Sequence, residues 1–422
     1  MSEFQYVGSA KAEWGQHWKA VLACSAGAGA SVTHLGTIGV LLPSIQQEYQ
    51  WPASQITAGM LIISIMSLVA SGFVGAIVDR LGSRRIGLIG LVVYCGSFAL
   101  LATSGPSIYN WLLLWALLGF GFVSITTTVW APVIAKRFYQ SRGLALAVIL
   151  SGNGICIAAL PIIATLLLEN YGWRGALVGV AAVVAIISIP LVLLFVRDLP
   201  VVHDSTKDEA GSVSDEAHGT TVREAVLSSV YIRIAVSAVI FTIASIALVV
   251  HFVPILREGG IDARGAAAVA SAIGLSMICG RLATGALLDR IHGSYIGAIS
   301  FGMPAIACLL LLTGPGVVTA VVIALVIGFS MGSELDVVAY VSTRYFGLRQ
   351  ISAIYGTLVG LITFAAGVGP MLSSLMFDQF GNYREMILLI IPFFLLGSAL
   401  MGSLPGYPNW QKGHRSSMKA AE

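Results

Sequence analysis

The sequence predicts an all-α membrane protein with twelve transmembrane helices in two parallel six-helix repeats. Composition is the first observation: 57% of the 422 residues are hydrophobic, 10% are charged, and the mean hydropathy is +0.89. Long apolar stretches are the second, because a hydrocarbon core about 30 Å thick requires helices of about 20 residues. The third is a repeated motif described below. The alternating ten-residue strands of a barrel are not visible, so helices are expected.

Apolar runs between charged or Gly/Pro-rich segments mark the helices. A polar stretch without hydrophobic periodicity separates the sixth helix from the seventh. We therefore expect an N-terminal bundle at 1–197, a cytoplasmic linker at 198–225, a C-terminal bundle at 226–404 and a cytoplasmic tail at 405–422. The expected helices are 18–43, 55–78, 86–105, 109–134, 143–168, 173–196, 230–255, 265–288, 294–313, 315–343, 351–377 and 385–404.

The orientation follows from lysine and arginine in the short loops. The loops on one face carry nine such residues and those on the other face carry four. The positive-inside rule then predicts that both termini are cytoplasmic. The first 16 residues are polar, and no small-residue cleavage site follows an apolar run, so no cleavable signal peptide is expected. The five cysteines fall in apolar runs and indicate neither disulfides nor a metal site.

A short motif occurs in both halves. The segment GAIVDRLGSRR at 75–85 follows the second expected helix, and GALLDRIHG at 285–293 follows the eighth, displaced by 210 residues. Such a repeat indicates two parallel copies of one unit. Its glycine allows helices to approach closely, its aspartate can pair with basic groups or a helix N-terminus, and its arginines suit anionic headgroups.

The first copy resembles the loop 2–3 signature of the major facilitator superfamily, and the six-plus-six helix count agrees. YGWRGAL at 171–177, together with segments 38–57, 141–155, 251–290 and 332–356, is similar to bacterial members related to monocarboxylate transporters and oxalate/formate exchangers. The resemblance implies a monomeric multi-pass protein of the bacterial inner membrane, whose repeated motif acts as a conformational latch. The latch residues would be Gly75, Asp79, Arg80, Arg84, Gly285, Asp289 and Arg290.

Arg281 is a bare arginine in an otherwise apolar helix. It lies eight residues before Asp289, about 12 Å from the end of the helix and near the bilayer midplane. A charge there costs at least about 2.5–3.5 kcal/mol, so it needs a partner or a cavity and is functional by default. Many monocarboxylate transporters have an aspartate four residues before this arginine, whereas Met277 occupies that position here.

Two acids on the tenth helix reach the same depth. Glu334 and Asp336 lie ten and eight residues before Arg344, about 15 and 12 Å deep. They point about 200° apart, so they cannot both face Arg281. Asp336 shares a polar stripe and is expected on the aqueous side, while Glu334 is expected to face the interior of the C-terminal bundle. An acid with little solvent can exchange a proton near neutral pH, which makes both candidates for proton coupling.

Other polar residues could complete a site around Arg281. In the superfamily, helices 1, 2, 4, 5, 7, 8, 10 and 11 line the central cavity. A carboxylate held by arginine has further lone pairs to satisfy, and Asn153 and Thr127 lie at the same level on the fifth and fourth helices. His34 lies somewhat further out on the first helix, and Tyr355 could shape an apolar wall.

Together these features predict a secondary active transporter of a small organic monocarboxylate, expected to be a proton-coupled symporter that uses alternating access. An exchanger of the oxalate/formate type, a proton-coupled efflux antiporter and a transport-dead sensor are the alternatives. No nucleotide-binding, protease or hydrolase motif occurs, so neither an enzyme nor a cofactor is expected. The expected partners are the carboxylate, protons and the lipid bilayer, and a net charge of +3 spread over loops gives no nucleic-acid signal.

Overall fold

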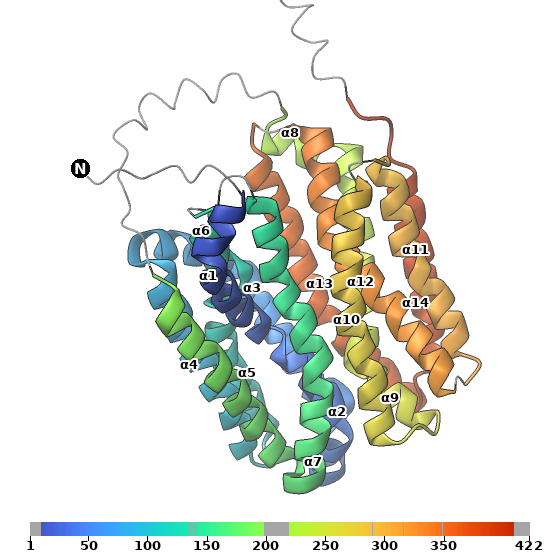
Figure 1. The fold of residues 1–422 in the computed structure, drawn as a ribbon. Helices are drawn as coiled ribbons and strands as arrows, with labels where there is room; N and C mark the ends of the chain where they lie inside the picture. Colours follow the sequence, from blue (N-terminus) through green and yellow to red (C-terminus); the bar gives the residue numbers. More distant parts are fainter. Residues whose placement is uncertain are drawn as a thin grey trace, which may run out of the picture.

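The structure, a computed structural model, describes residues 10–135, 137–138, 141–197, 219–288, 290–314, 316–347 and 349–408. Its helices pack as two bundles, which we call the N half (α1 to α7) and the C half (α9 to α14), with the short α8 before the C half (Figure 1). The helices are α1 Ala10–Ala30, α2 Thr33–Tyr49, α3 Ala53–Leu81, α4 Ser83–Leu100, α5 Ile108–Val123, α6 Thr127–Ala135, α7 Arg142–Phe195, α8 Val222–Val226, α9 Ser229–Glu258, α10 Ala263–Leu288, α11 Gly293–Leu311, α12 Val317–Phe346, α13 Ile351–Phe380 and α14 Arg384–Gly402.

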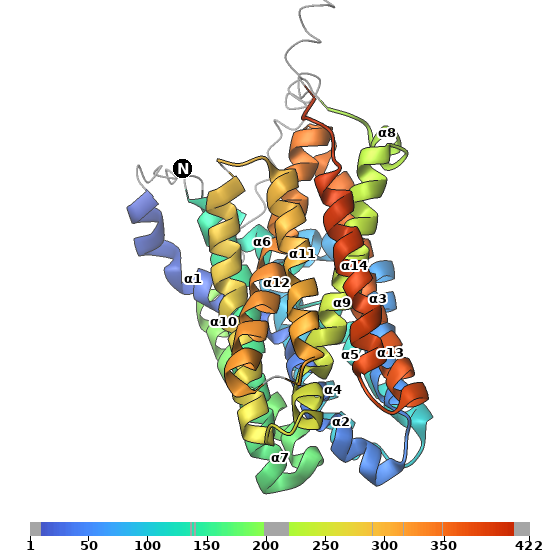
Figure 2. The ribbon, with the colours of Figure 1, turned by 90° about the vertical axis from the view of Figure 1, so that its right-hand side faces the viewer.

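The long helices run between two faces of the molecule. Helix α1 begins and α14 ends at one face, which we call the terminal face (Figures 1 and 2). The connections after α2, α9 and α13 lie at the other end, which we call the opposite face. A helix rises about 1.5 Å per residue, so the position of a residue along its helix gives its depth between the two faces.

The predicted architecture is confirmed. Eleven segments of the described chain are long and apolar enough to cross a membrane, and one of them spans 52 residues of α7. Gly172 interrupts α7 with non-helical backbone angles (φ 69°, ψ 178°), which suit glycine because it has no Cβ. The fifth and sixth expected helices lie on either side of this break, so the eleven segments contain the twelve expected helices.

Two expected helices are each interrupted once. The first is divided into α1 and α2, and the fourth into α5 and α6. Hydroxyl groups at both breaks donate to nearby backbone carbonyls: Ser31 Oγ to Ala28 O (2.7 Å) and Thr126 Oγ1 to Val123 O (3.2 Å). Such local bonds offer the backbone an alternative to the helical ladder. A pattern of apolar runs does not reveal these local hydrogen bonds, so the sequence predicted one uninterrupted helix at each of the two positions.

The first helix also begins earlier than expected, at Ala10 instead of residue 18. Its polar start is held by contacts with the segment that joins α6 to α7. The Glu13 carboxylate accepts hydrogen bonds from the Ser141 amide (3.1 Å) and hydroxyl (2.9 Å), and the Trp14 ring packs edge-on against Phe138. Most of the expected linker, 198–218, lies outside the described residues, but its end forms α8, which Thr221 and Glu224 cap reciprocally.

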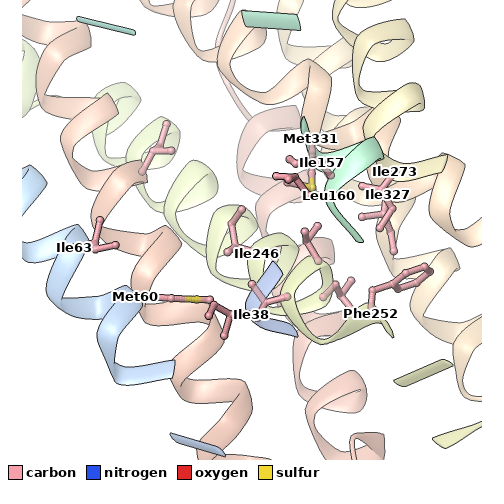
Figure 3. Packing of buried hydrophobic residues seen from close by; sticks show 14 of the residues in the cluster. Ile38, Met60, Ile63, Ile157, Leu160, Ile246, Phe252, Ile273, Ile327 and Met331 are labelled. Carbon is pink, nitrogen blue, oxygen red and sulfur yellow. The ribbon is translucent and has the colours of Figure 1, made fainter. Parts of the chain in front are cut away.

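The two halves meet in an apolar interface at close backbone distance. A small apolar pocket where α2, α7, α9 and α10 meet is lined by Ile157 of the N half and Ile273 of the C half, among others (Figure 3). Gly39 of α2 packs directly on the Val250 carbonyl of α9, where a Cβ would overlap that oxygen. Small residues permit such approaches between helices. The close packing of the two halves therefore requires glycine at this contact as well as the burial of apolar side chains.

Polar contacts join the halves near the opposite face. The Asp378 carboxylate of α13 accepts hydrogen bonds from the Ala53 (2.7 Å) and Ser54 (2.9 Å) amides, the first N–H groups of α3. One turn deeper, the Thr57 hydroxyl of α3 donates to the Ser374 hydroxyl of α13 (3.0 Å).

On the other flank of the interface, Arg264 of α10 pairs with Glu169 of α7 at 2.7 Å. We call Asp378, the Thr57–Ser374 pair and the Glu169–Arg264 pair the opposite-face gate. These contacts hold the two halves together at this face.

We expect Asp378→Ala to raise the fraction of molecules that are open at the opposite face. Loss of a helix cap costs about 1 kcal/mol, which corresponds to about a five-fold change in an equilibrium. The measurement is the rate at which a membrane-impermeant maleimide, added on the side of the opposite face, labels Met60→Cys in a cysteine-free background. Met60 is buried in the core near the interface (Figure 3), so labelling should become several-fold faster.

The matched control is Asp262→Ala. Asp262 also caps a helix at the opposite face, accepting from the Gly265 amide (3.2 Å), but both residues belong to the C half. Labelling in this control should keep the rate of the parent protein. Equal rates in the two aspartate variants would show that Asp378 does not hold the halves together.

Candidate functional site

Arg281 lies in the interior of the C half, on the part of α10 nearer the terminal face. Its side chain is 3% exposed, and Nη1 lies 3.7 Å from Asp336 Oδ1 of α12. That distance is too long for a hydrogen bond. Among the described residues, neither Nη1 nor Nη2 has a hydrogen-bond partner. The nearby Asp336 carboxylate therefore compensates the charge of the buried guanidinium, but no described residue accepts a hydrogen bond from its terminal N–H groups.

Close packing of α10 on α12 gives this geometry. A Cβ at Gly332 of α12 would lie 2.9 Å from the Arg281 amide nitrogen, and a Cβ at Gly280 of α10 would overlap the Phe329 carbonyl. The Thr284 and Ser333 hydroxyls bond to each other across the same contact (2.6 Å). Because the two backbones approach so closely, a short aspartate one turn beyond Gly332 can reach the arginine.

The two acids of α12 point to different neighbours, as their spacing predicts. The Asp336 side chain faces Arg281 and is 26% exposed. Glu334 is 7% exposed and forms a hydrogen bond with the Thr242 hydroxyl of α9. The expected placement of Glu334 inside the C-terminal bundle agrees with this contact. Asp336 thus reaches Arg281 from the neighbouring helix, whereas Met277, four residues before Arg281 on its own helix, is uncharged.

Tyr355 of α13 belongs to the same cluster. Its side chain interacts electrostatically with Arg281, Asp336 and Glu334, and Glu334 in turn interacts with Arg281. Three helices of the C half, α10, α12 and α13, thus bring one base, two acids and one phenol together. We call Arg281, Glu334, Asp336 and Tyr355 the charged cluster.

Asn153 lies on α7 beside the part of α10 that precedes Arg281. Its neighbour Gly154 packs on the Gly274 carbonyl and on Ile278 of α10, one turn before Arg281. The Asn153 Oδ1 atom is buried and has no hydrogen-bond partner within the described part of the chain. Asn153 therefore offers an unused acceptor in the α7–α10 contact, although no direct bond joins it to the described residues of the cluster.

The other two N-half candidates lie in different surroundings. His34 is buried in the N half, where its Nδ1 bonds to the Tyr94 hydroxyl (3.0 Å) and its ring packs edge-on against Trp115 and Phe122. Thr127 is the first residue of α6 and is partly exposed. No bond between either residue and the charged cluster is found among the described residues.

The structure describes only part of the proposed latch. Arg80 and Arg290 are exposed near the terminal face, and Arg84 donates to the Leu193 carbonyl (2.7 Å). At Gly285, no atom of the described residues lies within 4 Å of the position where a Cβ would stand. Asp289 and the side-chain surroundings of Gly75 and Asp79 lie outside the described residues.

Sequence reasoning missed Thr242 and the opposite-face gate. Thr242 is a polar residue in the middle of a predicted transmembrane helix, which is a usable signal, although a threonine there commonly bonds only to its own helix. The gate residues are polar groups at helix ends, where charge is common, so their pairing across the halves left no trace in the sequence pattern.

Comparisons with known proteins agree with this architecture. The model of the Major Facilitator Superfamily matches residues 21–356. Monocarboxylate transporter 13 of Rattus norvegicus is 26% identical over 401 residues, covering 93% of this chain and 90% of that protein. Monocarboxylate transporter 11 of Mus musculus is also 26% identical, over 93% of this chain and 88% of its own length.

A solved structure has the same fold. The crystal structure of a bacterial homologue of the human lysosomal transporter Spinster, in an inward-facing and occupied conformation, superposes with a TM-score of 0.70 over 90% of this chain and 95% of that chain, at 14% identity. The family match covers most of the sequence. The chain therefore belongs to the Major Facilitator Superfamily.

Proposed function

We propose that this chain is a secondary active transporter that takes up a small organic monocarboxylate together with a proton by alternating access. The observation that carries the proposal is Arg281, a buried guanidinium whose terminal nitrogens have no acceptor among the described residues. Buried polar groups are normally hydrogen-bonded, so this pair of donors suits a ligand. The similarity to monocarboxylate transporters 13 and 11 supports the same substrate class.

The charge balance of the cluster supports coupling to protons. Arg281 and Asp336 together are close to neutral when both are ionised. A bound carboxylate adds a negative charge to a buried site, where an uncompensated charge costs several kcal/mol. A proton taken up by Asp336 or Glu334 removes that excess. Binding of the anion and uptake of the proton then favour each other, which is the requirement for symport.

The proposed transport cycle follows from the positions of the gate and the site. We assign the terminal face to the cytoplasm, because the loops at that end carry more lysine and arginine. The structure then corresponds to a state in which the outer end is closed by the opposite-face gate. The protein is proposed to act as a monomer in the bacterial inner membrane, with Asn153 and Tyr355 available to the substrate once it is bound to Arg281.

Arg281→Lys is expected to abolish uptake while leaving the amount of protein in the membrane unchanged. A guanidinium offers a planar pair of donors to a carboxylate, whereas an ammonium offers a point charge and cannot reproduce the fork. Uptake of a labelled monocarboxylate by proteoliposomes measures the effect. Arg264→Lys, which keeps the charge of a gate arginine, is the matched control and should retain most uptake. Full activity of Arg281→Lys would remove this residue from the site.

Uptake is expected to follow an inward proton gradient and to collapse with a protonophore. Glu334→Gln or Asp336→Asn should uncouple it, because an amide cannot take up the compensating proton. Exchange of internal for external substrate should persist in the uncoupled variant, since exchange does not need net proton movement. Uptake that ignores both pH and protonophore, yet depends on substrate inside the vesicle, would instead indicate an anion exchanger.

Monocarboxylates should compete for uptake at least about tenfold better than dicarboxylates such as oxalate or succinate, a difference of about 1.4 kcal/mol. Arg281 is one cation, and α13 contains no Lys, Arg or His that could bind a second carboxylate. A second anionic group in a site of low dielectric would stay unpaired. A dianion that competes as well as the best monoanion would overturn the assignment of a single cationic subsite.

A further inference from the structure

Thr242 forms two hydrogen bonds through one hydroxyl group. The oxygen lies 2.8 Å from the Ala238 carbonyl one turn earlier on α9, and it also forms a hydrogen bond with Glu334 Oε1 of α12. Thr242 is 2% exposed, so its surroundings are protein. It thereby connects the glutamate of one helix to the backbone of another.

A threonine hydroxyl has one proton to donate and two lone pairs with which to accept. When Glu334 is ionised, it can only accept, so the Thr242 proton must point to the carboxylate. When Glu334 is protonated, the carboxyl can donate to Thr242 and the Thr242 proton can turn to the Ala238 carbonyl. Both arrangements use the same atoms at the same positions. The contact between Thr242 and Glu334 is a hydrogen bond in both states, whereas the contact with the Ala238 carbonyl becomes one only when Glu334 is protonated.

We infer that Thr242 is a positioning residue for the proton carried by Glu334, because its hydroxyl satisfies the carboxyl group in both protonation states. The inference rests on the proposed proton coupling. It adds the residue that allows the buried Glu334 carboxyl to take up a proton and to release it. No atom is transferred to Thr242: its O–H rotates about the Cβ–Oγ1 bond, while the proton on Glu334 comes from the aqueous side and returns to it.

The remaining charged and titratable neighbours of Glu334 do not offer such a partner. Arg281 and Tyr355 reach it electrostatically from α10 and α13, and Asp336 lies two residues further along its own helix. Helix α11 carries no Asp, Glu, His, Lys or Arg. On α9, Arg233 and His251 each lie nine residues from Thr242. Of the described residues, Thr242 is the one with a hydrogen bond to the Glu334 carboxylate.

The test compares Thr242→Val with Thr242→Ser. Valine keeps the shape of threonine and removes the hydroxyl, while serine keeps the hydroxyl. Loss of the donor raises the cost of ionised Glu334, so the variant carboxyl should hold its proton to higher pH. The external pH at which uptake is half-maximal should therefore rise by about one to two pH units in Thr242→Val. Thr242→Ser should return it to the parent value.

Thr165→Val is the matched control. Thr165 is also buried and also bonds to a carbonyl one turn earlier, from Oγ1 to Pro161 O (2.8 Å), but it lies on α7 in the N half. This variant should keep the parent pH profile. A general effect of removing a buried threonine hydroxyl would shift both profiles alike and would overturn the assignment to Thr242.

A second measurement does not depend on transport. The infrared spectrum of the purified protein contains a carbonyl band for each protonated carboxyl, and the band that disappears in Glu334→Gln belongs to Glu334. Its titration should move to higher pH in Thr242→Val, and its frequency should rise because a hydrogen bond is lost. If the titration and frequency of the band are unchanged in Thr242→Val, Thr242 does not hydrogen-bond to the Glu334 carboxyl in the way inferred here.

The outcomes separate this inference from the proposed function. If uptake by the parent protein does not depend on pH, the proposed coupling fails, and the infrared band then decides alone whether Thr242 holds the Glu334 proton. If uptake depends on pH and Glu334→Gln abolishes that dependence, the coupling stands. In that case an unshifted profile in Thr242→Val would overturn the role of Thr242 and leave the coupling intact.

Discussion

A positive charge held inside an apolar bundle is the constraint on which the C half depends. Arg281 cannot be left alone at that depth, and the glycine contact between α10 and α12 brings Asp336 to 3.7 Å from it. A closer bidentate pair would satisfy the guanidinium and leave little for a ligand. The observed separation compensates the charge and leaves the terminal N–H groups without acceptors. The packing of α10 against α12 therefore determines how well the Arg281 charge is compensated and whether its N–H groups can bind a ligand.

Helix α10 connects the parts of the molecule that a transport cycle has to coordinate. Arg264 joins the opposite-face gate near its start, Gly274 touches α7 of the other half, and Arg281 lies two turns further along. A rigid helix transmits a tilt at one end to every position along its length. Movement of α7 against α10 would thus alter the gate and the surroundings of Arg281 together, because Gly274 packs directly on the α7 backbone.

The sequence predicted those features that depend on one helix at a time. Apolar runs located the twelve helices, although two of them are each interrupted once, and the angle of 100° per residue predicted different neighbours for Glu334 and Asp336, as their contacts with Thr242 and Arg281 show. Features that depend on how two helices meet were not predictable in this way. The bond between Thr242 and Glu334 requires the register of α9 against α12, which no repeat in the sequence encodes. Likewise, His34 has polar chemistry suitable for a ligand, yet its ring is packed among aromatic side chains of the N half.

The cap that Asp378 places on α3 has a consequence for the energetic cost of separating the halves. The first N–H groups of a helix have no partner within that helix, so they always need an outside acceptor. If the halves part at this face, water enters and can solvate both the freed amides and the carboxylate. The contact thus exchanges one set of hydrogen bonds for another instead of losing them. A joint made in this way fixes alignment while keeping the two conformations close in free energy, as a cycle that must reverse at every turnover requires.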